Sequence, residues 1–333
     1  MSAALEIPVR LAAALAPPER RGLARDGVRM LVTDRNTRMH THAHFYRLHE
    51  FLQPGDLLVV NDTQTMPAAL EATRNDGSLL NLHVSTMIGG GLWHAEPRGP
   101  AQLGERVTLR DGAEATLLAP LDPAHQRLWY TAFSLPLPMS EYLMRFGEPI
   151  RYGYVTQRFP LSDYQTIFAR TAGSSEMPSA ARPFTPRTLA ALRKRDVEIA
   201  TITLHCGVSS FEAPERPGIE RFAVSPQTAW AVNAARSDGR RVIATGTTVV
   251  RALESAISGD CVIAASGWTD RVVDPDHPPR AVDALLTGFH DASSTHQWML
   301  NAFADSALLG DAYAQAAACG YFQHEFGDVH LIL

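Results

Sequence analysis

The stretch that decides the fold is Val242-Ile-Ala-Thr-Gly-Thr-Thr-Val-Val-Arg-Ala-Leu-Glu-Ser255. It opens with an apolar run rich in β-branched residues, continues with a Gly-Thr-Thr turn, and closes with a helix-forming run. The amide groups at the start of such a helix, together with the helix dipole, favour an anion. Arg251 follows Thr247 by four residues, so both lie on one face of the helix. The stretch therefore predicts either an anion site built by Gly246, Thr247, Thr248 and Arg251 or an ordinary connection with a threonine N-cap.

Similar patterns on both sides of this stretch indicate an α/β protein. Upstream, Gly55-Asp-Leu-Leu-Val-Val60 has the continuous apolar character of a fully buried strand. From about residue 136 onward, apolar strands alternate with helical stretches such as residues 186–195 and 225–235. Strands that alternate with helices are typical of a sheet covered by helices.

The segment between these two regions has a different texture. Short alternating runs are separated by closely spaced turn signals, which predicts a small antiparallel sheet or barrel. The turns are Asn75-Asp-Gly77, Gly89-Gly-Gly91, Arg98-Gly-Pro100, Asp111-Gly112 and Asp122-Pro123. We therefore expect an α/β domain formed by residues 1–66 and 136–333, interrupted by an inserted antiparallel β-barrel domain of residues 67–135.

Composition narrows the class of protein. A chain of 333 residues with 45% apolar residues can bury a large core, and it contains no apolar run as long as a membrane span. Its three cysteines, Cys206, Cys261 and Cys319, are scattered and odd in number, which favours a reducing, cytoplasmic environment over a disulfide scaffold. The net charge of −5 gives no general affinity for nucleic acid, so such binding would need a local basic patch. A basic run at residues 182–195 is either a solvated helix face or such a patch.

Histidines at alternate positions raise the question of a metal site. In a strand, His40, His42 and His44 share one face, which is a possible ligand geometry. No carboxylate or cysteine pair accompanies them. We therefore expect a half-exposed strand and no metal.

Polar residues recur after several predicted strands. Asn61-Asp62-Thr63 follows the buried strand that ends at Val60, and α/β proteins bind ligands at the carboxyl ends of their strands. Each such residue alone is also explained as a turn or a helix N-cap. Several of them in one chain favour a composite site. The other segments are Asp163-Tyr-Gln165, Leu204-His-Cys-Gly207, Gly267-Trp-Thr-Asp270 and Asp283-Ala-Leu-Leu-Thr-Gly-Phe-His290.

Taken in order, these segments resemble the S-adenosylmethionine:tRNA ribosyltransferase-isomerase family of queuosine synthesis. Many short motifs recur in one order over nearly the whole chain, and the family combines an α/β domain with an inserted barrel. Further matching pieces are Pro54-Gly-Asp-Leu-Leu-Val-Val-Asn-Asp-Thr63 with Pro67-Ala68, Gly246-Thr-Thr248 with Arg251, Leu253 and Glu254, and Gly327-Asp328.

The resemblance implies a reaction in which S-adenosylmethionine donates its ribosyl carbons. In the family, the amine of 7-aminomethyl-7-deazaguanine in tRNA attacks the sugar, adenine and methionine leave, and an epoxycyclopentanediol forms. No metal or redox cofactor is required. The matched motifs imply that acid–base catalysis falls among Asp62, His205, Asp270 and Asp283. They imply S-adenosylmethionine binding by Asn61, Thr63, Tyr164, Gln165, Gly207, Gly246, Thr247, Thr248, Arg251, Glu254, Thr269, Phe289 and His290.

Several cationic positions of the family pattern differ here. Gln64, Ala69, Glu96 and Pro183 stand where the family has Lys, Arg, Arg and His. Because each lost phosphate contact weakens nucleic-acid binding, this difference favours a small-molecule acceptor over tRNA. The alternatives are the tRNA ribosyltransferase-isomerase itself and a catalytically inactive protein that binds S-adenosylmethionine or RNA.

Overall fold

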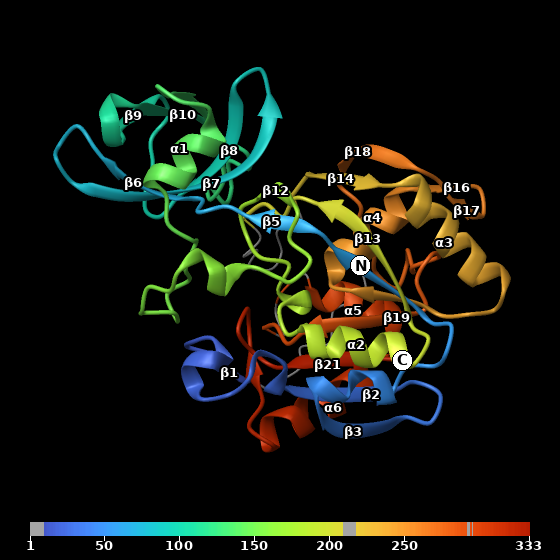
Figure 1. Cartoon of the computed structure of the whole chain (residues 1–333). Helices are drawn as coiled ribbons and strands as arrows, with labels where there is room; N and C mark the ends of the chain where they lie inside the picture. Colours follow the sequence, from blue (N-terminus) through green and yellow to red (C-terminus); the bar gives the residue numbers. More distant parts are fainter. Residues whose placement is uncertain (1–9, 209–217, 292–293, 295) are drawn as a thin grey trace.

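The computed structural model describes residues 10–208, 218–291, 294 and 296–333. The described chain forms a large helix-covered sheet and a smaller closed barrel, which stands apart from the sheet at the upper left of Figure 1. The chain enters the sheet first, forms the barrel, and then returns to complete the sheet. The predicted α/β fold with an inserted antiparallel barrel is confirmed.

The large sheet has four parallel strands at its centre and antiparallel strands on both sides. The parallel strands are β13, β4, β15 and β19, so their carboxyl ends meet at one edge. Strand β21 runs antiparallel to β19 and therefore begins at that edge. In spatial order the strands are β18 (Ala265–Thr269), β14 (Glu220–Val224), β13 (Glu198–Leu204), β4 (Leu57–Asn61), β15 (Val242–Thr245), β19 (Ala284–Gly288), β21 (Val329–Ile332), β2 (Arg29–Asp34) and β3 (Met39–His44).

Alternate residues of the central strands pack into different cores. Leu57 and Val59 of β4 face the core that also contains helices α3, α4, α5 and α6. Leu58 and Val60 face the opposite core, which contains helix α2. This two-sided burial is the physical reason for the continuous apolar run in β4. The helices are α2 (Pro186–Lys194), α3 (Pro226–Ser237), α4 (Thr247–Ser255), α5 (His296–Phe303) and α6 (Ser306–Ala318).

The barrel closes from six antiparallel strands in the order β10-β11-β8-β7-β6-β9. Its inward residues, such as Leu82, Ala95 and Leu117, form a separate core, onto which helix α1 (Met139–Phe146) packs with Tyr142. The predicted turns at residues 75–77 and 89–91 join consecutive barrel strands. The strands are β6 (Ala69–Thr73), β7 (Leu79–Gly89), β8 (Leu92–Pro97), β9 (Glu105–Thr108), β10 (Glu114–Pro120) and β11 (Trp129–Ser134).

Short strand pairs complete the fold. β5 (Thr63–Thr65) and β12 (Thr171–Ser174) pair in parallel in the region between the barrel and the sheet, where both chain crossings lie (Figure 1). β1 (Ala12–Ala13) pairs with β20 (Phe322–Gln323), and β16 (Ile257–Ser258) with β17 (Cys261–Val262). Among the described residues, no helix combines the length and apolar character needed to cross a membrane.

Candidate functional site

A cavity of about 410 Å³ opens at the edge of the sheet where the parallel strands end. Gly246 follows β15 and Gly288 ends β19, and both line the cavity. Because β21 is antiparallel to β19, His324 and Glu325, which precede β21, return to the same edge. Ligands in α/β proteins bind at this edge of the sheet. We call this cavity the edge pocket.

The amino end of α4 forms one side of the edge pocket. Gly246 is the N-cap residue with φ +90°, a conformation that favours glycine, and Thr247 and Thr248 begin the helix. The N-cap residue is a glycine and so has no side chain to cap this helix end, and the first amide groups of a helix have no partner within it. Thr248 also accepts a hydrogen bond at Oγ1 from Asn61 Nδ2, at 3.2 Å. This end of the pocket is therefore suited to an anionic group of a ligand.

Arg251 reaches the edge pocket but already has an anion of the protein as its partner. It forms an ion pair with Glu220, and these two side chains are only 8% and 9% exposed. Arg251 Nε also donates to the carbonyl of Arg271, at 3.0 Å. Glu220 in turn accepts from the Gly207 amide, at 3.0 Å. The sequence predicted Arg251 as part of an anion site with Gly246, Thr247 and Thr248, whereas in the structure the guanidinium pairs with Glu220. The Arg251 side chain is thus held in place before any ligand arrives.

Aromatic rings and two carboxyl groups form another part of the edge-pocket lining. Tyr154 stacks on His324 with ring centroids 4.5 Å apart, and Tyr152 lies 6.0 Å from Tyr154 at a small interplanar angle of 21°. The Tyr152 hydroxyl donates a hydrogen bond to Glu176. Glu325 lines the same part. We call these five residues the Tyr–Glu corner. The sequence reasoning missed all five, because they lie in irregular segments without a periodic or spacing signal.

Two histidines lie against each other within the edge pocket. The rings of His290 and His296 are 3.8 Å apart between centroids, and His296 Nε2 hydrogen-bonds with Thr287 Oγ1 at 3.0 Å. Burial lowers the pKa of His290 to about 4 and lowers the pKa of His296 well below its usual value. Both rings are therefore neutral at pH 7. His290 was predicted from the sequence as a ligand-binding residue, whereas His296 was not.

A second cluster of predicted residues lies at the same sheet edge, outside the edge pocket. Thr63 Oγ1 hydrogen-bonds with His205 Nδ1, at 2.9 Å, while Asp62 accepts from Thr203 Oγ1, at 2.6 Å. Gly173 has φ +148°, and a Cβ there would lie 2.7 Å from the His205 ring. Burial and the nearby Arg221 lower the pKa of His205, opposed by Asp62. His205 is therefore a neutral ring at pH 7.

Three further predicted residues cross-link secondary-structure elements. Asn61 is fully buried and bonds both the amide and the carbonyl of Leu204, which ties β4 to β13. Gln165 uses its amide to bond both backbone groups of Thr65. Tyr164 is buried against Phe326, at 5.1 Å between ring centroids. These contacts account for the polar groups of Asn61 and Gln165 without a ligand.

The remaining predicted residues lie away from the edge pocket. Thr269 hydrogen-bonds with Ser255 at the carboxyl end of β18, and Asp270 after it is exposed. Glu254 accepts from the backbone amides of residues 280 and 281, at 2.8 and 2.7 Å. Phe289 is fully buried in the core and stacks on His330.

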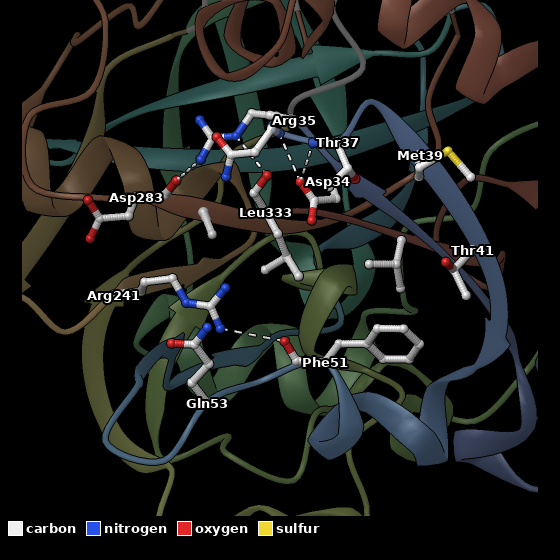
Figure 2. A pocket seen from close by; sticks show the side chains of 13 residues that line it. Asp34, Arg35, Thr37, Met39, Thr41, Phe51, Gln53, Arg241, Asp283 and Leu333 are labelled. Atoms are coloured by element: carbon white, nitrogen blue, oxygen red, sulfur yellow. Dashed lines mark hydrogen bonds between the residues drawn. The ribbon is translucent and has the colours of Figure 1, made fainter.

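Asp283 lies at the opposite edge of the sheet, just before β19. Its carboxylate accepts from the Val242 amide at 2.8 Å. It lines a different cavity, of about 420 Å³, with Arg35, Arg241 and Leu333, as Figure 2 shows. Arg241 in this cavity is paired with Asp56. The structure therefore does not bring Asp283 together with the other three predicted acid–base residues, which follow β4, β13 and β18.

The alternating histidines lie on β3, as the strand pattern predicted, and each has its own partner. His40 hydrogen-bonds with Thr33 and lies 3.2 Å from Asp311, whereas His42 bonds Tyr321. His44 contacts the carbonyl of residue 27. Over the described parts of the chain, no group of three or more His, Cys, Asp or Glu residues has a metal-binding arrangement.

The position of Glu96 weakens the electrostatic argument against tRNA. Its side chain is 1% exposed on the face of β8 that points away from the barrel core, where it contacts His83, Arg98 and Arg127. Hydrogen bonding to His83 and the charges of Arg127 and Arg98 outweigh burial and lower the pKa of Glu96 to about 2. Its charge is therefore compensated within the protein. Pro183 is also buried, so two of the four altered positions are not on the surface.

Comparisons with known proteins agree with this architecture. The sequence model of a family described as "Queuosine biosynthesis protein" matches residues 5–332. An S-adenosylmethionine:tRNA ribosyltransferase-isomerase of Moorella thermoacetica is 37% identical over 93% of this chain and 94% of its own length. One of the same name from Thermus thermophilus is 35% identical over 95% and 97%.

A solved structure has the same fold. The crystal structure of an S-adenosylmethionine tRNA ribosyltransferase from Thermotoga maritima matches with a TM-score of 0.57 at 26% identity. The match covers 98% of this chain and 100% of that chain. Because the family match, the curated relatives and the solved structure each span almost the full length, the chain belongs to the queuosine biosynthesis protein family.

Proposed function

We propose that this protein transfers and isomerises the ribosyl group of S-adenosylmethionine on tRNA, with release of adenine and methionine. The acceptor would be the amine of 7-aminomethyl-7-deazaguanine in tRNA, as the resemblance implies. The observation that carries the proposal is the edge pocket at the ends of the parallel strands, in a chain that aligns over 93–95% of its length with enzymes of that name. A tRNA substrate would place the enzyme in the cytoplasm.

The edge pocket is the donor site in this proposal. S-adenosylmethionine carries a carboxylate, and the start of α4 at Gly246, Thr247 and Thr248 supplies amide groups and a positive dipole end for it. Arg251 supports this end by fixing Glu220 and the carbonyl of Thr269 at the end of β18. No resident cofactor is needed for this binding, since S-adenosylmethionine is itself a substrate.

We assign the acid–base roles to the predicted residues Asp62, His205, Asp270 and Asp283, which the structure ranks by their position. Asp62, His205 and Asp270 all follow strands that end at the same edge of the sheet as the edge pocket. Among them, His205 is a neutral ring, a form able to accept a proton, and it is oriented by Thr63. Asp283 is the weakest candidate because it lies at the opposite edge and caps the Val242 amide.

The choice of tRNA over a small-molecule acceptor is supported by two observations. The relatives that align over almost their full length are named for tRNA. In addition, the Glu96 carboxylate is buried and paired with Arg98 and Arg127, so it does not present a negative charge to phosphates. The basic run of residues 182–195 provides less free positive charge for binding tRNA than its sequence indicated. Arg182 and Arg187 in this run are paired with Glu19 and Asp26.

The test is incubation with S-adenosylmethionine, with and without tRNA that carries the 7-aminomethyl-7-deazaguanine base, followed by mass spectrometry. We expect adenine and methionine to appear only with this tRNA, together with a heavier tRNA. Release with a small amine in place of tRNA would show a different acceptor. Binding of S-adenosylmethionine without any release would show an inactive binding protein.

A pair of variants tests the location of the donor site. Thr247→Trp places a large ring at the α4 side of the edge pocket and should abolish both binding of S-adenosylmethionine and turnover. Thr41→Trp, an exposed position that lines the cavity of Figure 2, is the matched control and should leave both unchanged. The opposite result would move the donor site to the other edge of the sheet.

A further inference from the structure

The strands at one end of the large sheet are covered by helices on one face only. Phe222 and Val224 of β14 face the core that contains α3 and α4. On the other side of the sheet, the core that contains α2 includes no described residue of β14 or β18. On that side Arg221 is exposed, and Trp268 is 45% exposed. The sheet therefore extends beyond its cover, with β18 as its outermost strand (Figure 1).

Side chains on the uncovered side lie in rows across the strands. The His205 amide donates to the Arg221 carbonyl at 2.9 Å, and Arg221 is in register with Trp268. Because neighbouring strands are about 4.8 Å apart, an imidazole, a guanidinium and an indole lie side by side over about 10 Å. We call this row and the next one the open sheet face. The next row consists of Thr203, Ala223 and Ser266.

A hollow of about 370 Å³ adjoins these rows. Asp62 lines it and accepts a hydrogen bond from Thr203 Oγ1 at 2.6 Å. Thr201, Ser225 and Ser266 add further hydroxyl groups to the lining. Hydroxyl and carboxylate groups can bond the hydroxyls of ribose and the polar edges of bases. The hollow is therefore suited to a polar, hydroxyl-bearing ligand.

Two exposed cations of this region have no partner in the protein. The Arg221 side chain forms no hydrogen bond or ion pair with another described residue, and neither does that of Arg170, whose amide donates to the Asp62 carbonyl at 2.8 Å. Asp62 and the exposed Asp270 offset their charges. A ligand of this face must therefore gain from stacking as well as from charge. Single-stranded nucleic acid combines phosphates with flat bases and meets both conditions.

We propose that the open sheet face binds unstacked nucleotides of the tRNA substrate next to the modified base, with one base on Trp268 and one phosphate on Arg221. This inference rests on the proposed function. The modified base must leave its stack before its amine can reach the proposed proton acceptor, His205. His205 belongs to the same row as Arg221 and Trp268, so a nucleotide close to the modified base in the chain reaches them.

The first measurement is the affinity for tRNA that carries the 7-aminomethyl-7-deazaguanine base. Trp268→Thr removes the ring but keeps a residue suited to a strand, and it should weaken binding by on the order of tenfold. Trp268→Phe keeps an aromatic face and should retain most of the affinity. Trp230→Ala is the matched control, because Trp230 is 72% exposed on α3, which covers the other face of the sheet. It should bind tRNA as tightly as wild type.

The second measurement is the salt dependence of the same binding. Each phosphate contact of a single strand contributes about 0.7 to the slope of log affinity against log salt concentration. Arg221→Gln should therefore weaken binding and reduce this slope by about 0.7, whereas Trp268→Thr should weaken binding and leave the slope unchanged. Arg236→Gln, on α3, is the control and should change neither. A merely structural role for Arg221 or Trp268 would not separate the two variants in this way.

The outcomes separate the inference from the proposed function. If the wild-type protein modifies tRNA while folded Trp268→Thr and Arg221→Gln proteins bind it as tightly as wild type, the open sheet face is not the contact and the proposed function stands. Equal losses in Trp268→Phe and Trp268→Thr, with an unchanged slope in Arg221→Gln, would also overturn the inference. If the wild-type protein neither binds this tRNA nor releases adenine with it, both are overturned. A thermal melt of each variant checks folding, and Trp268→Phe tests stacking even if Trp268→Thr unfolds.

Discussion

At the residue scale, polar side chains at the strand ends divide into structural and ligand-facing groups. Asn61 uses both atoms of its amide to join β4 with β13, whereas Thr247 and His290 face the edge pocket. The same sequence pattern, a polar residue after an apolar strand, precedes both outcomes. Burial and hydrogen-bond partners distinguish them, and both depend on neighbours distant in the sequence.

The Arg251–Glu220 pair gives a prediction at this scale. Arg251→Ala leaves the Glu220 carboxylate buried without its cation, so we expect the free energy of unfolding to fall by about 3–5 kcal/mol. The double variant Arg251→Ala/Glu220→Gln removes the stranded charge and should recover part of this loss. Urea unfolding followed by circular dichroism measures both. An Arg251→Ala protein as stable as wild type would mean that the pair is not formed in solution.

At the scale of elements, the connection between α4 and β19 is held by one side chain. Glu254, on α4, accepts from two consecutive backbone amides, those of Arg280 and Ala281. Burial nevertheless raises the pKa of Glu254 above its usual value, despite these hydrogen bonds. A raised carboxyl pKa means that the ionised form is disfavoured in the folded protein at neutral pH. Glu254 therefore contributes as an acceptor, and its charge opposes folding.

Two substitutions of Glu254 separate these contributions. Glu254→Ala removes the acceptor and leaves two amides without it, so we expect a loss of about 2–4 kcal/mol in unfolding free energy. Glu254→Gln keeps an acceptor oxygen without the charge and should stay within about 1 kcal/mol of wild type. Chemical denaturation at pH 7 provides the comparison. Equal stability of the two variants would show that the amides do not depend on this acceptor.

At the scale of the whole molecule, buried histidines occur in both the barrel and the sheet. Burial lowers the pKa of His94 in the barrel to about 4, and that of His330 in the sheet to about 3. Unfolded histidine titrates near its ordinary value of about 6.5. Between about pH 6.5 and 4, the unfolded chain therefore binds more protons at these positions than the folded protein. Their contribution to stability is complete above pH 6.5 and is lost as the pH falls through this window.

His94→Phe tests this pH dependence, because burial is the cause of the lowered pKa of His94. Between pH 6.5 and pH 5, the wild-type protein should lose up to about 1.4 kcal/mol per pH unit more than the variant. His277→Gln, which replaces an exposed histidine, is the control and should follow the wild-type curve. Urea unfolding at several pH values gives the slopes. Parallel curves for wild type and His94→Phe would contradict the prediction.

Local patterns in the sequence were sufficient to predict the architecture. The continuous apolar run at β4, the strand–turn–helix of β15 and α4, and the closely spaced turns of the barrel each depend on residues near one another in the chain. Periodicity and turn chemistry are short-range properties, so the fold class could be predicted from them. The order of strands in the sheet was not predicted, because it depends on pairings between distant segments.

The candidate site was only partly predictable, for the same physical reason. The amino end of α4 is local, and the sequence indicated Gly246, Thr247 and Thr248. The Tyr–Glu corner unites residues 152–154, 176 and 324–325, which come together only because β21 runs antiparallel to β19 and the chain re-enters the sheet after the barrel. Likewise, whether Glu96 acts as a surface charge or a buried ion-pair partner was decided by its contacts with His83 and Arg127 from other segments of the chain. Sequence determined the architecture and one end of the pocket, whereas tertiary structure decided which charges meet there, because charge pairing and burial depend on contacts between segments far apart in the chain.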